Sequence, residues 1–187
     1  MRIVTGDLRG RPIRTPEGQD TRPTSDRARQ AVFNILEHAP WSDGVADLRV
    51  IDLFAGSGAM GLEALSRGAA ACLFVESAGP ALDAIGANID TFKLGGRARV
   101  LRQDATRLAA RPASEPPFDL AFLDPPYAKG LGEAALVALK VGGWLADGAT
   151  VIFERGAGEP ELEAPGFDVL DQRRYGAAKL VVLRPLT

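Results

Sequence analysis

Short apolar runs alternate with segments of helical periodicity from Val50 onward. Runs of about four to eight apolar residues are typical of buried strands, and apolar residues three and four positions apart are typical of helices. Repeated strand–helix units predict an α/β fold with a parallel sheet, helices on both faces, and ligands at the carboxyl ends of the strands. The predicted strands are 50–54, 71–75, 98–101, 118–123 and 150–153, and the predicted helices are 59–67, 80–92 and 132–140.

The N-terminal part of the chain follows another pattern. Residues 3–5 and 11–14 flank a polar turn, and they predict a small β-hairpin. The stretch that follows is rich in Pro, Gly and Thr, which predicts a loop. A helix is then predicted over about 25–37, because Thr24 or Ser25 can serve as its N-cap and the apolar residues after it recur at helical spacing.

Two further strands are predicted near the C-terminus, over about 168–171 and 179–183. They are joined through the residues 173–176, and we expect them to form an antiparallel hairpin at the edge of the sheet. The complete sheet is then mostly parallel with seven strands. We divide the chain into an N-terminal hairpin and loop over residues 1–23 and a main domain over residues 24–187.

Composition excludes several classes of chemistry. The chain has one Cys and one His, so it cannot form an intrachain disulfide or a CxxC metal site, and we expect no metal. No apolar run approaches the roughly 20 residues that cross a bilayer. The first residues contain no apolar signal core, so we expect a cytoplasmic protein without a membrane partner. Of the oligomeric states, a monomer is the one that we favour.

Positive charge is concentrated at the N-terminus. The whole chain has a net charge of −2, whereas its first 29 residues contain seven arginines against four acidic residues. This asymmetry indicates a segment that contacts a polyanion such as RNA or DNA. A general preference for arginine is the alternative explanation, since the chain has 18 arginines and four lysines. The candidate nucleic-acid contacts are Arg9, Arg11, Arg22 and Arg27.

A glycine-rich turn follows the first strand of the alternating region. Gly56, Gly58 and Gly61 match the dinucleotide fingerprint G-x-G-x-x-G, and Glu76 closes the next strand where a ribose-binding acid belongs. An NAD-dependent oxidoreductase is therefore one interpretation. The carboxylate of Asp52 favours another, because it would repel a pyrophosphate but would attract the cationic amino-acid end of S-adenosylmethionine.

A second motif, Asp-Pro-Pro-Tyr, ends the strand predicted over 118–123. The carboxylate of Asp124 and the carbonyl of Pro125 can accept hydrogen bonds from an amine and stabilise the charge that develops as it is methylated. Pro125 and Pro126 stiffen the loop, since each fixes φ and lacks an amide hydrogen. Tyr127 can stack on a base that has left its helix or loop.

These motifs carry a resemblance to a known family. Asp-Pro-Pro-Tyr is the signature of amino-methyltransferases, and DLFAGSGAMGLEALSRGA is similar to their cofactor motif. Taken together, the N-terminal strings resemble the bacterial 16S ribosomal RNA guanine-N2 methyltransferases. These strings are RIVTG at 2–6, LRGR at 8–11, RPTSDR at 22–27 and AVFNIL at 31–36.

The resemblance implies a Rossmann-like, S-adenosylmethionine-dependent methyltransferase fold with a small N-terminal hairpin. It implies contacts from Glu76 to the ribose hydroxyls and from Asp104 and Ala105 to the adenine of the cofactor. Asp104 has a second interpretation as a helix cap. The complete set of implied cofactor contacts is Asp52, Gly56, Gly58, Glu76, Asp104 and Ala105.

The expected activity is methyl transfer from S-adenosylmethionine to the N2 amine of a guanine in 16S ribosomal RNA. The partner is either that RNA or the 30S subunit. Asp124 and Pro125 would orient the amine, and Tyr127 would stack on the base. Besides the NAD-dependent enzyme, two alternatives stay open: a DNA adenine-N6 methyltransferase, and a ribosome-assembly factor that keeps the fold without catalysis.

Overall fold

Seven strands form one sheet in the computed structural model, which describes residues 1–18, 26–127 and 129–187. Their order is β3-β2-β1-β4-β5-β7-β6. Strands β1 to β5 are parallel to one another, whereas β7 is antiparallel to both β5 and β6. The mostly parallel seven-stranded sheet predicted from the sequence is confirmed. The strands are β1 (Arg49–Leu53), β2 (Ala71–Glu76), β3 (Ala98–Arg102), β4 (Phe118–Leu123), β5 (Leu145–Gly156), β6 (Phe167–Tyr175) and β7 (Ala178–Pro185).

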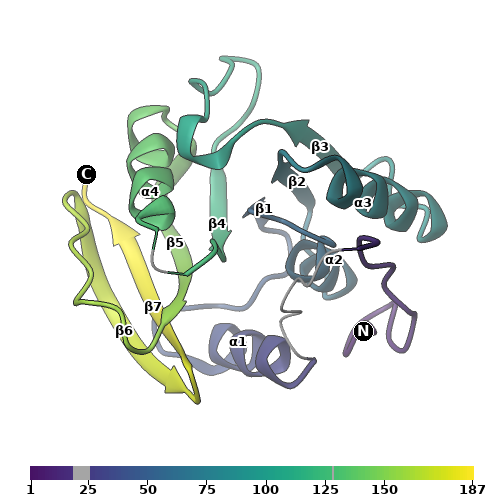
Figure 1. Cartoon of the computed structure of the whole chain (residues 1–187), viewed down its shortest axis with the longest axis horizontal. Coiled ribbons are helices and arrows are strands. Elements are labelled where there is room, and N and C mark those ends of the chain that lie inside the picture. The colour runs from purple at the N-terminus through teal and green to yellow at the C-terminus, as the bar shows by residue number, and fades with distance from the viewer. Residues whose placement is uncertain (19–25, 128) are drawn as a thin grey trace.

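Helices cover both faces of the sheet (Figure 1). Apolar side chains of α1, α2 and α3 pack into one hydrophobic cluster with one face, and those of α4 and the short helix η1 pack into a second cluster with the other face. The helical elements are α1 (Asp26–His38), α2 (Ala59–Ser66), α3 (Gly79–Thr91), η1 (Ala105–Arg107) and α4 (Leu131–Val141).

The central strands β1 and β4 place two loops side by side. Both strands are almost entirely buried, as expected for parallel strands that are covered on both faces. Leu53 at the end of β1 pairs with Leu123 at the end of β4. The strand order reverses direction between these two strands, and a sheet of this kind binds ligands at such a position.

Several predicted strand boundaries are wrong. The largest difference is at β5, which covers Leu145–Gly156 although only 150–153 was predicted as a strand. Phe54 was expected in the first strand, but its φ of 55° turns the chain out of the sheet. The segment 173–176 was expected as a connection, but β6 continues to Tyr175, which pairs with Ala178. A two-residue turn is sufficient here because Gly176 has a φ of 57° and pairing extends the strands up to it.

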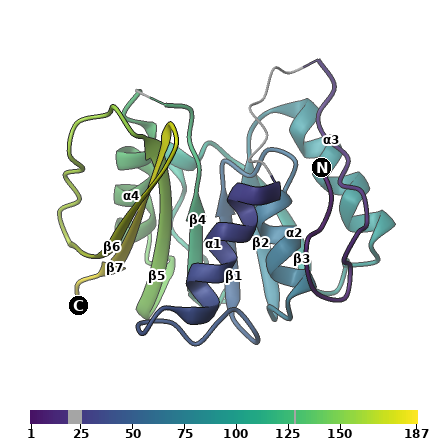
Figure 2. The same ribbon diagram turned by 90° about the horizontal axis from the view of Figure 1, so that it is seen from below.

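The N-terminal segment, residues 1–18, lies beside α2 and α3 (Figures 1 and 2). The hairpin expected here takes the form of one isolated antiparallel bridge, between Arg2 and Pro12, without a strand on either side. Pro12 has no amide hydrogen, which limits the ladder that can form. The expected caps Thr24 and Ser25, and the expected boundary between residues 23 and 24, lie outside the described residues.

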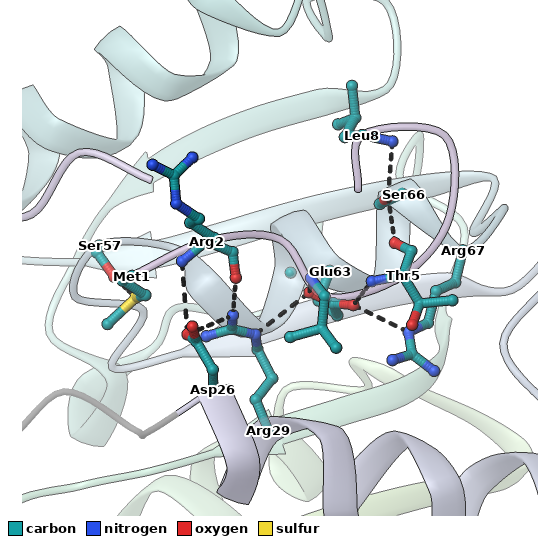
Figure 3. Close-up of polar contacts among 12 residues, drawn as sticks. Met1, Arg2, Thr5, Leu8, Asp26, Arg29, Ser57, Glu63, Ser66 and Arg67 are labelled. Carbon is teal, nitrogen blue, oxygen red and sulfur yellow. Dashed lines mark hydrogen bonds and ion pairs between the residues drawn. The ribbon is translucent and has the colours of Figure 1, made fainter. Parts of the chain in front are cut away.

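A buried carboxylate fastens this segment and α1 to the main body (Figure 3). Glu63 on α2 is fully buried, and its two oxygens accept the amide hydrogens of Val4 and Thr5, each at 2.9 Å. The same oxygens pair with the guanidinium groups of Arg29, at 3.2 Å, and Arg67, at 3.1 Å. Glu63 therefore joins three parts of the chain that are far apart in sequence.

Further polar groups complete this attachment. Arg29 on α1 is also fully buried, and it donates to the carbonyl of Arg2 and to the carboxylate of Asp26. Ser66 donates to the carbonyl of Thr5 at 2.6 Å. Asn88 on α3 pairs with the amide and the carbonyl of Arg14, at 2.8 and 3.0 Å. The N-terminal segment is thus held by buried polar side chains of α1, α2 and α3.

We predict that Glu63→Ala lowers the free energy of unfolding by about 3–5 kcal/mol, because it leaves two arginines and two backbone amides without their buried acceptor. Urea denaturation of wild type and variant measures this difference. The matched control is Glu37→Ala, which removes the half-exposed partner of Arg67 and is expected to cost at most about 1 kcal/mol. Equal losses for the two variants would contradict the role assigned to Glu63.

Candidate active site

A cavity of about 1240 Å³ opens at the carboxyl edge of the sheet. Its walls include the loops after β1, β2, β3 and β4, the end of β5, α1, the turn between β6 and β7, and the N-terminal segment. The attachments of Glu63 and Arg29 therefore hold two of the walls in place. The lining residues that the sequence had singled out are Arg27, Asp52, Gly56, Glu76, Asp104, Asp124, Pro125, Pro126 and Tyr127.

The glycines of the turn have different roles. Gly56 lines the cavity with a φ of 58°, and no atom lies closer than 4.0 Å to the place where its Cβ would be. Gly58 and Gly61 face the core instead. A Cβ on Gly58 would lie 3.1 Å from the ring of Phe74, and one on Gly61 would lie 2.4 Å from the same ring. These two glycines let α2 pack closely on β2, so Gly56 is the one that leaves its backbone open to a ligand.

Asp52 is a buried carboxylate in the wall of the cavity. Its Oδ2 accepts the amide hydrogen of Gly61 at 3.0 Å. Burial raises the pKa of Asp52 well above its ordinary value, the hydrogen bond from Gly61 opposes this, and the charges of Asp124 and Glu76 raise it further. A bound cation next to Asp52 would favour the ionised form. The site is therefore suited to a positively charged ligand.

Glu76 organises the turn from the end of β2. Its Oε2 accepts the amide hydrogen of Gly56 at 2.7 Å, and its Oε1 accepts those of Ser77 and Ala78 at 2.9 and 3.0 Å. The carboxylate thus fixes the loop after β1 to the loop after β2. It also lines the cavity, where it can accept a hydroxyl hydrogen.

Asp104 lines the cavity and caps η1. Its Oδ1 accepts from the amide and the hydroxyl of Thr106, at 2.9 and 2.8 Å, and these two bonds lower the pKa of Asp104, with the hydroxyl having the larger effect. The alternative interpretation of Asp104 as a cap is therefore correct, and a second function at the cavity is compatible with it. Ala105 is buried in the cluster with α4, and it is not one of the cavity-lining residues.

All four residues of the Asp-Pro-Pro-Tyr motif line the cavity, directly after β4. Tyr127 donates its hydroxyl hydrogen to Oε1 of Glu154 at 2.8 Å, and its ring packs against the backbone of Gly156. Glu154 is on β5. A single glutamate within a strand forms no motif in the sequence, so only its pairing with Tyr127 in the structure reveals it.

The candidate nucleic-acid-binding arginines differ in whether they line the cavity. Arg27 lines the cavity, whereas Arg9 is exposed on the N-terminal segment. The guanidinium of Arg11 lies 4.9 Å from the centre of the Phe92 ring and donates to the carbonyl of Thr91 at 3.1 Å. Arg22 lies outside the described residues.

The described ranges 1–18, 26–127 and 129–187 contain no group of three or more His, Cys, Asp or Glu side chains arranged to bind a metal ion. Within the same ranges, no helix is both long enough and apolar enough to cross a membrane.

A family model described as Conserved hypothetical protein 95 matches residues 1–184. The chain belongs to this family. The match with the Conserved hypothetical protein 95 family includes the N-terminal segment, α1 and every loop that lines the cavity. The site described above therefore lies entirely inside the region that defines the family.

Named relatives and solved structures agree with this membership. A protein of Escherichia coli (strain K12) named Ribosomal RNA small subunit methyltransferase D is 40% identical over 154 residues, which are 82% of this chain and 74% of that protein. A protein of the same name from Haemophilus influenzae is 32% identical over 177 residues, 94% of this chain and 89% of that protein. The solved structure described as "Putative methyltransferase yhhF from Escherichia coli" superposes with a TM-score of 0.83 at 32% identity, covering 100% of this chain and 98% of that one. The fold is the Rossmann-like methyltransferase fold, and the resemblance carried by the sequence motifs is confirmed.

We predict that Asp52→Asn stabilises the ligand-free protein, and increasingly so as the pH rises. The ordinary pKa of an unfolded aspartate is about 3.9, and the folded value is higher, so the folded state retains a proton that the unfolded state has lost. The contribution of Asp52 to stability therefore decreases as pH rises between these two values, and it levels off above the folded pKa. The asparagine can still accept from Gly61 but has no charge to bury.

Urea denaturation of wild type and variant across pH 4 to 8 measures this difference. The control is Asp43→Asn, which changes an exposed carboxylate in a loop. If the stability difference between Asp52→Asn and wild type does not change with pH, the buried charge is not the source of the effect.

Proposed function

We propose that this protein transfers a methyl group from S-adenosylmethionine to the exocyclic N2 amine of a guanine in 16S ribosomal RNA, in the cytoplasm. The observation that carries the proposal is one cavity that brings together the buried carboxylate of Asp52, the open glycine turn at Gly56, and the Asp-Pro-Pro-Tyr loop at Asp124. The names of the relatives support a small-subunit ribosomal RNA as the substrate.

The residues of the cavity fit S-adenosylmethionine. Asp52 attracts its cationic end, the open backbone at Gly56 leaves room for it, and Glu76 can accept from ribose hydroxyls. We retain Asp104 and Ala105 as the expected adenine contacts and Gly58 as part of the expected turn, on the basis of the family resemblance. When bound, the cofactor supplies a methyl carbon bonded to a sulfonium, and this C–S bond breaks as the new N–C bond forms.

The Asp-Pro-Pro-Tyr loop prepares the amine of the base. A nitrogen conjugated to a ring is a poor nucleophile, because its lone pair is delocalised. Hydrogen bonds from the amine to the carboxylate of Asp124 and the carbonyl of Pro125 favour a more tetrahedral nitrogen and stabilise its developing positive charge. The proton becomes acidic only after the nitrogen is cationic, so solvent can remove it once the transfer is complete.

Tyr127 and the two prolines support this geometry. The hydroxyl of Tyr127 is fixed by Glu154 and one part of its ring packs on Gly156, so the ring is held at the cavity wall as a surface on which a base can stack. Pro126 restricts the loop without contributing an amide hydrogen. A base must leave its helix or loop to reach a site of this depth.

The alternatives are less compatible with the cavity. A pyrophosphate of NAD would meet the carboxylates of Asp52 and Glu76 at the glycine turn, which disfavours a dinucleotide. The names of the relatives specify ribosomal RNA, which favours an RNA substrate over the DNA of an adenine methyltransferase. A factor without catalysis would have no need for an intact amine-binding motif.

We predict that Asp124→Ala lowers the rate of methyl transfer by at least about 100-fold, because an acceptor of the transition-state amine is lost. Radiolabelled S-adenosylmethionine with unmodified 30S particles, 16S RNA or DNA, followed by nucleoside analysis, identifies the product and gives the rate. Affinity for the cofactor, measured by calorimetry, should change little. The matched control is Asp43→Ala, and full turnover by the Asp124 variant would refute the assigned role.

We also predict that neutralising Arg9, or Arg11, lowers the salt dependence of RNA binding by about one phosphate contact each. Fluorescence anisotropy at several salt concentrations gives the slope. Arg99→Gln is the control, because Arg99 lies at the amino end of β3, away from the cavity, and is paired with Glu115. If the slope does not change, these arginines do not contact phosphates. The contact of Arg11 with the ring of Phe92 would then be its role in the structure.

A further inference from the structure

Glu154 stands beside Asp124 at the carboxyl edge of the sheet. Leu123 of β4 pairs in parallel with Phe153 of β5, and the next residues along the two strands are Asp124 and Glu154. Neighbouring strands are about 4.8 Å apart. Both residues line the cavity, so two carboxylates approach any base held there from adjacent strands.

The side chain of Glu154 lines the cavity and is held there by Tyr127. Its register partner on β7 is Leu180, which lines the same cavity, and its Oε1 accepts the hydroxyl hydrogen of Tyr127 at 2.8 Å. Within the part of the chain that the structure describes, its Oε2 has no hydrogen-bond partner. Tyr127 therefore fixes one oxygen of the carboxylate and leaves the other to accept from a ligand.

The amino bases differ in the atom next to the amine. In adenine and cytosine the ring nitrogen on the Watson–Crick edge beside the amine is an acceptor. In guanine the corresponding atom, N1, carries a hydrogen and is a donor. A carboxylate placed beside the amine-binding loop would accept this hydrogen from guanine, whereas it would face the lone pair of an adenine or cytosine nitrogen.

We infer that Glu154 is the residue that selects guanine, by accepting the N1–H while Asp124 and Pro125 hold the N2 amine. This inference rests on the proposed function, and it adds a physical reason for the choice of base within the same cavity. The two carboxylates then accept from adjacent donors on one edge of guanine, the N1–H and the N2 amine. Adenine and cytosine are rejected because the lone pair of their ring nitrogen would face the negative charge of Glu154 without a hydrogen bond.

A structural role is the competing explanation, because Glu154 also holds Tyr127 in place. Two variants separate the possibilities. Glu154→Gln offers an amide that can either accept or donate, so it tolerates an acceptor at position 1 of the base. Tyr127→Phe removes the hydroxyl that holds Glu154 but leaves the carboxylate and the ring.

The test compares guanine with 2-aminopurine, which keeps the 2-amino group but has an acceptor at N1. The nucleotide that the wild-type enzyme methylates is first identified by mass spectrometry, and 2-aminopurine is then placed there in a 16S RNA ligated around a synthetic segment and assembled into 30S particles. The measured quantity is the ratio of kcat/KM for the two bases. 2-Aminopurine also lacks the O6 of guanine. This loss changes the ratio of kcat/KM by the same factor in every variant, so it cancels when the ratios of the variants are compared.

We expect the wild-type enzyme to prefer guanine, and Glu154→Gln to narrow this preference by about 10- to 100-fold. Tyr127→Phe should lower turnover on both bases and leave the ratio unchanged. Glu163→Gln, in an exposed part of the chain, is the control for loss of a carboxylate and should behave like the wild type.

An unchanged ratio in Glu154→Gln overturns the inference and leaves the proposed function intact, provided that the wild type forms N2-methylguanine. A ratio that narrows equally in Tyr127→Phe also overturns it, because Glu154 then acts only through the tyrosine. If the wild type forms N6-methyladenine, or no methylated nucleoside, the proposed function fails first and the assignment of Glu154 fails with it.

Discussion

The buried carboxylate of Glu63 is the constraint on which the cavity depends. A Rossmann-like sheet by itself provides the glycine turn and the Asp-Pro-Pro-Tyr loop, but the opposite walls come from α1 and the N-terminal segment. Neither element is part of the sheet, and the N-terminal segment has only one isolated bridge of its own. Glu63 pairs with Arg29 of α1 and with two backbone amides of the N-terminal segment. It therefore holds α1 and the segment in place as walls of the cavity.

The lining of the cavity is predominantly negative in charge. The lining residues within the described ranges include five carboxylates, while Arg27 is the arginine among them. Such a cavity attracts a sulfonium or an ammonium group and repels phosphate. Exposed arginines such as Arg9 and Arg174 lie outside the lining. This distribution favours a mode of binding in which the backbone of an RNA stays at the surface and a single neutral base reaches the cofactor.

Local motifs could be predicted from the sequence, and tertiary partnerships could not. Asp52 lies near the end of the buried strand β1, Gly56 is in the turn after it, and Asp124 directly follows β4, so their meeting at one edge follows from the parallel sheet. Glu63 could not be recognised in the same way, because a charge on a fully buried helix face has meaning only once its distant arginine partners are known. The length of β6 could not be predicted for a similar reason. Its C-terminal residues are polar and exposed on an edge strand, so they do not alternate with apolar residues.

The most direct measurement of the central claim is amide hydrogen exchange at Val4 and Thr5, whose amide hydrogens are bound by Glu63. If the N-terminal segment is a fixed wall of the cavity, these amides exchange only through global unfolding and are protected as well as those of the central strand β1. If they exchange near the intrinsic rate of an unfolded chain while β1 stays protected, the segment detaches by itself. The N-terminal segment would then not be a fixed wall of the cavity, and Glu63 would not hold it in place.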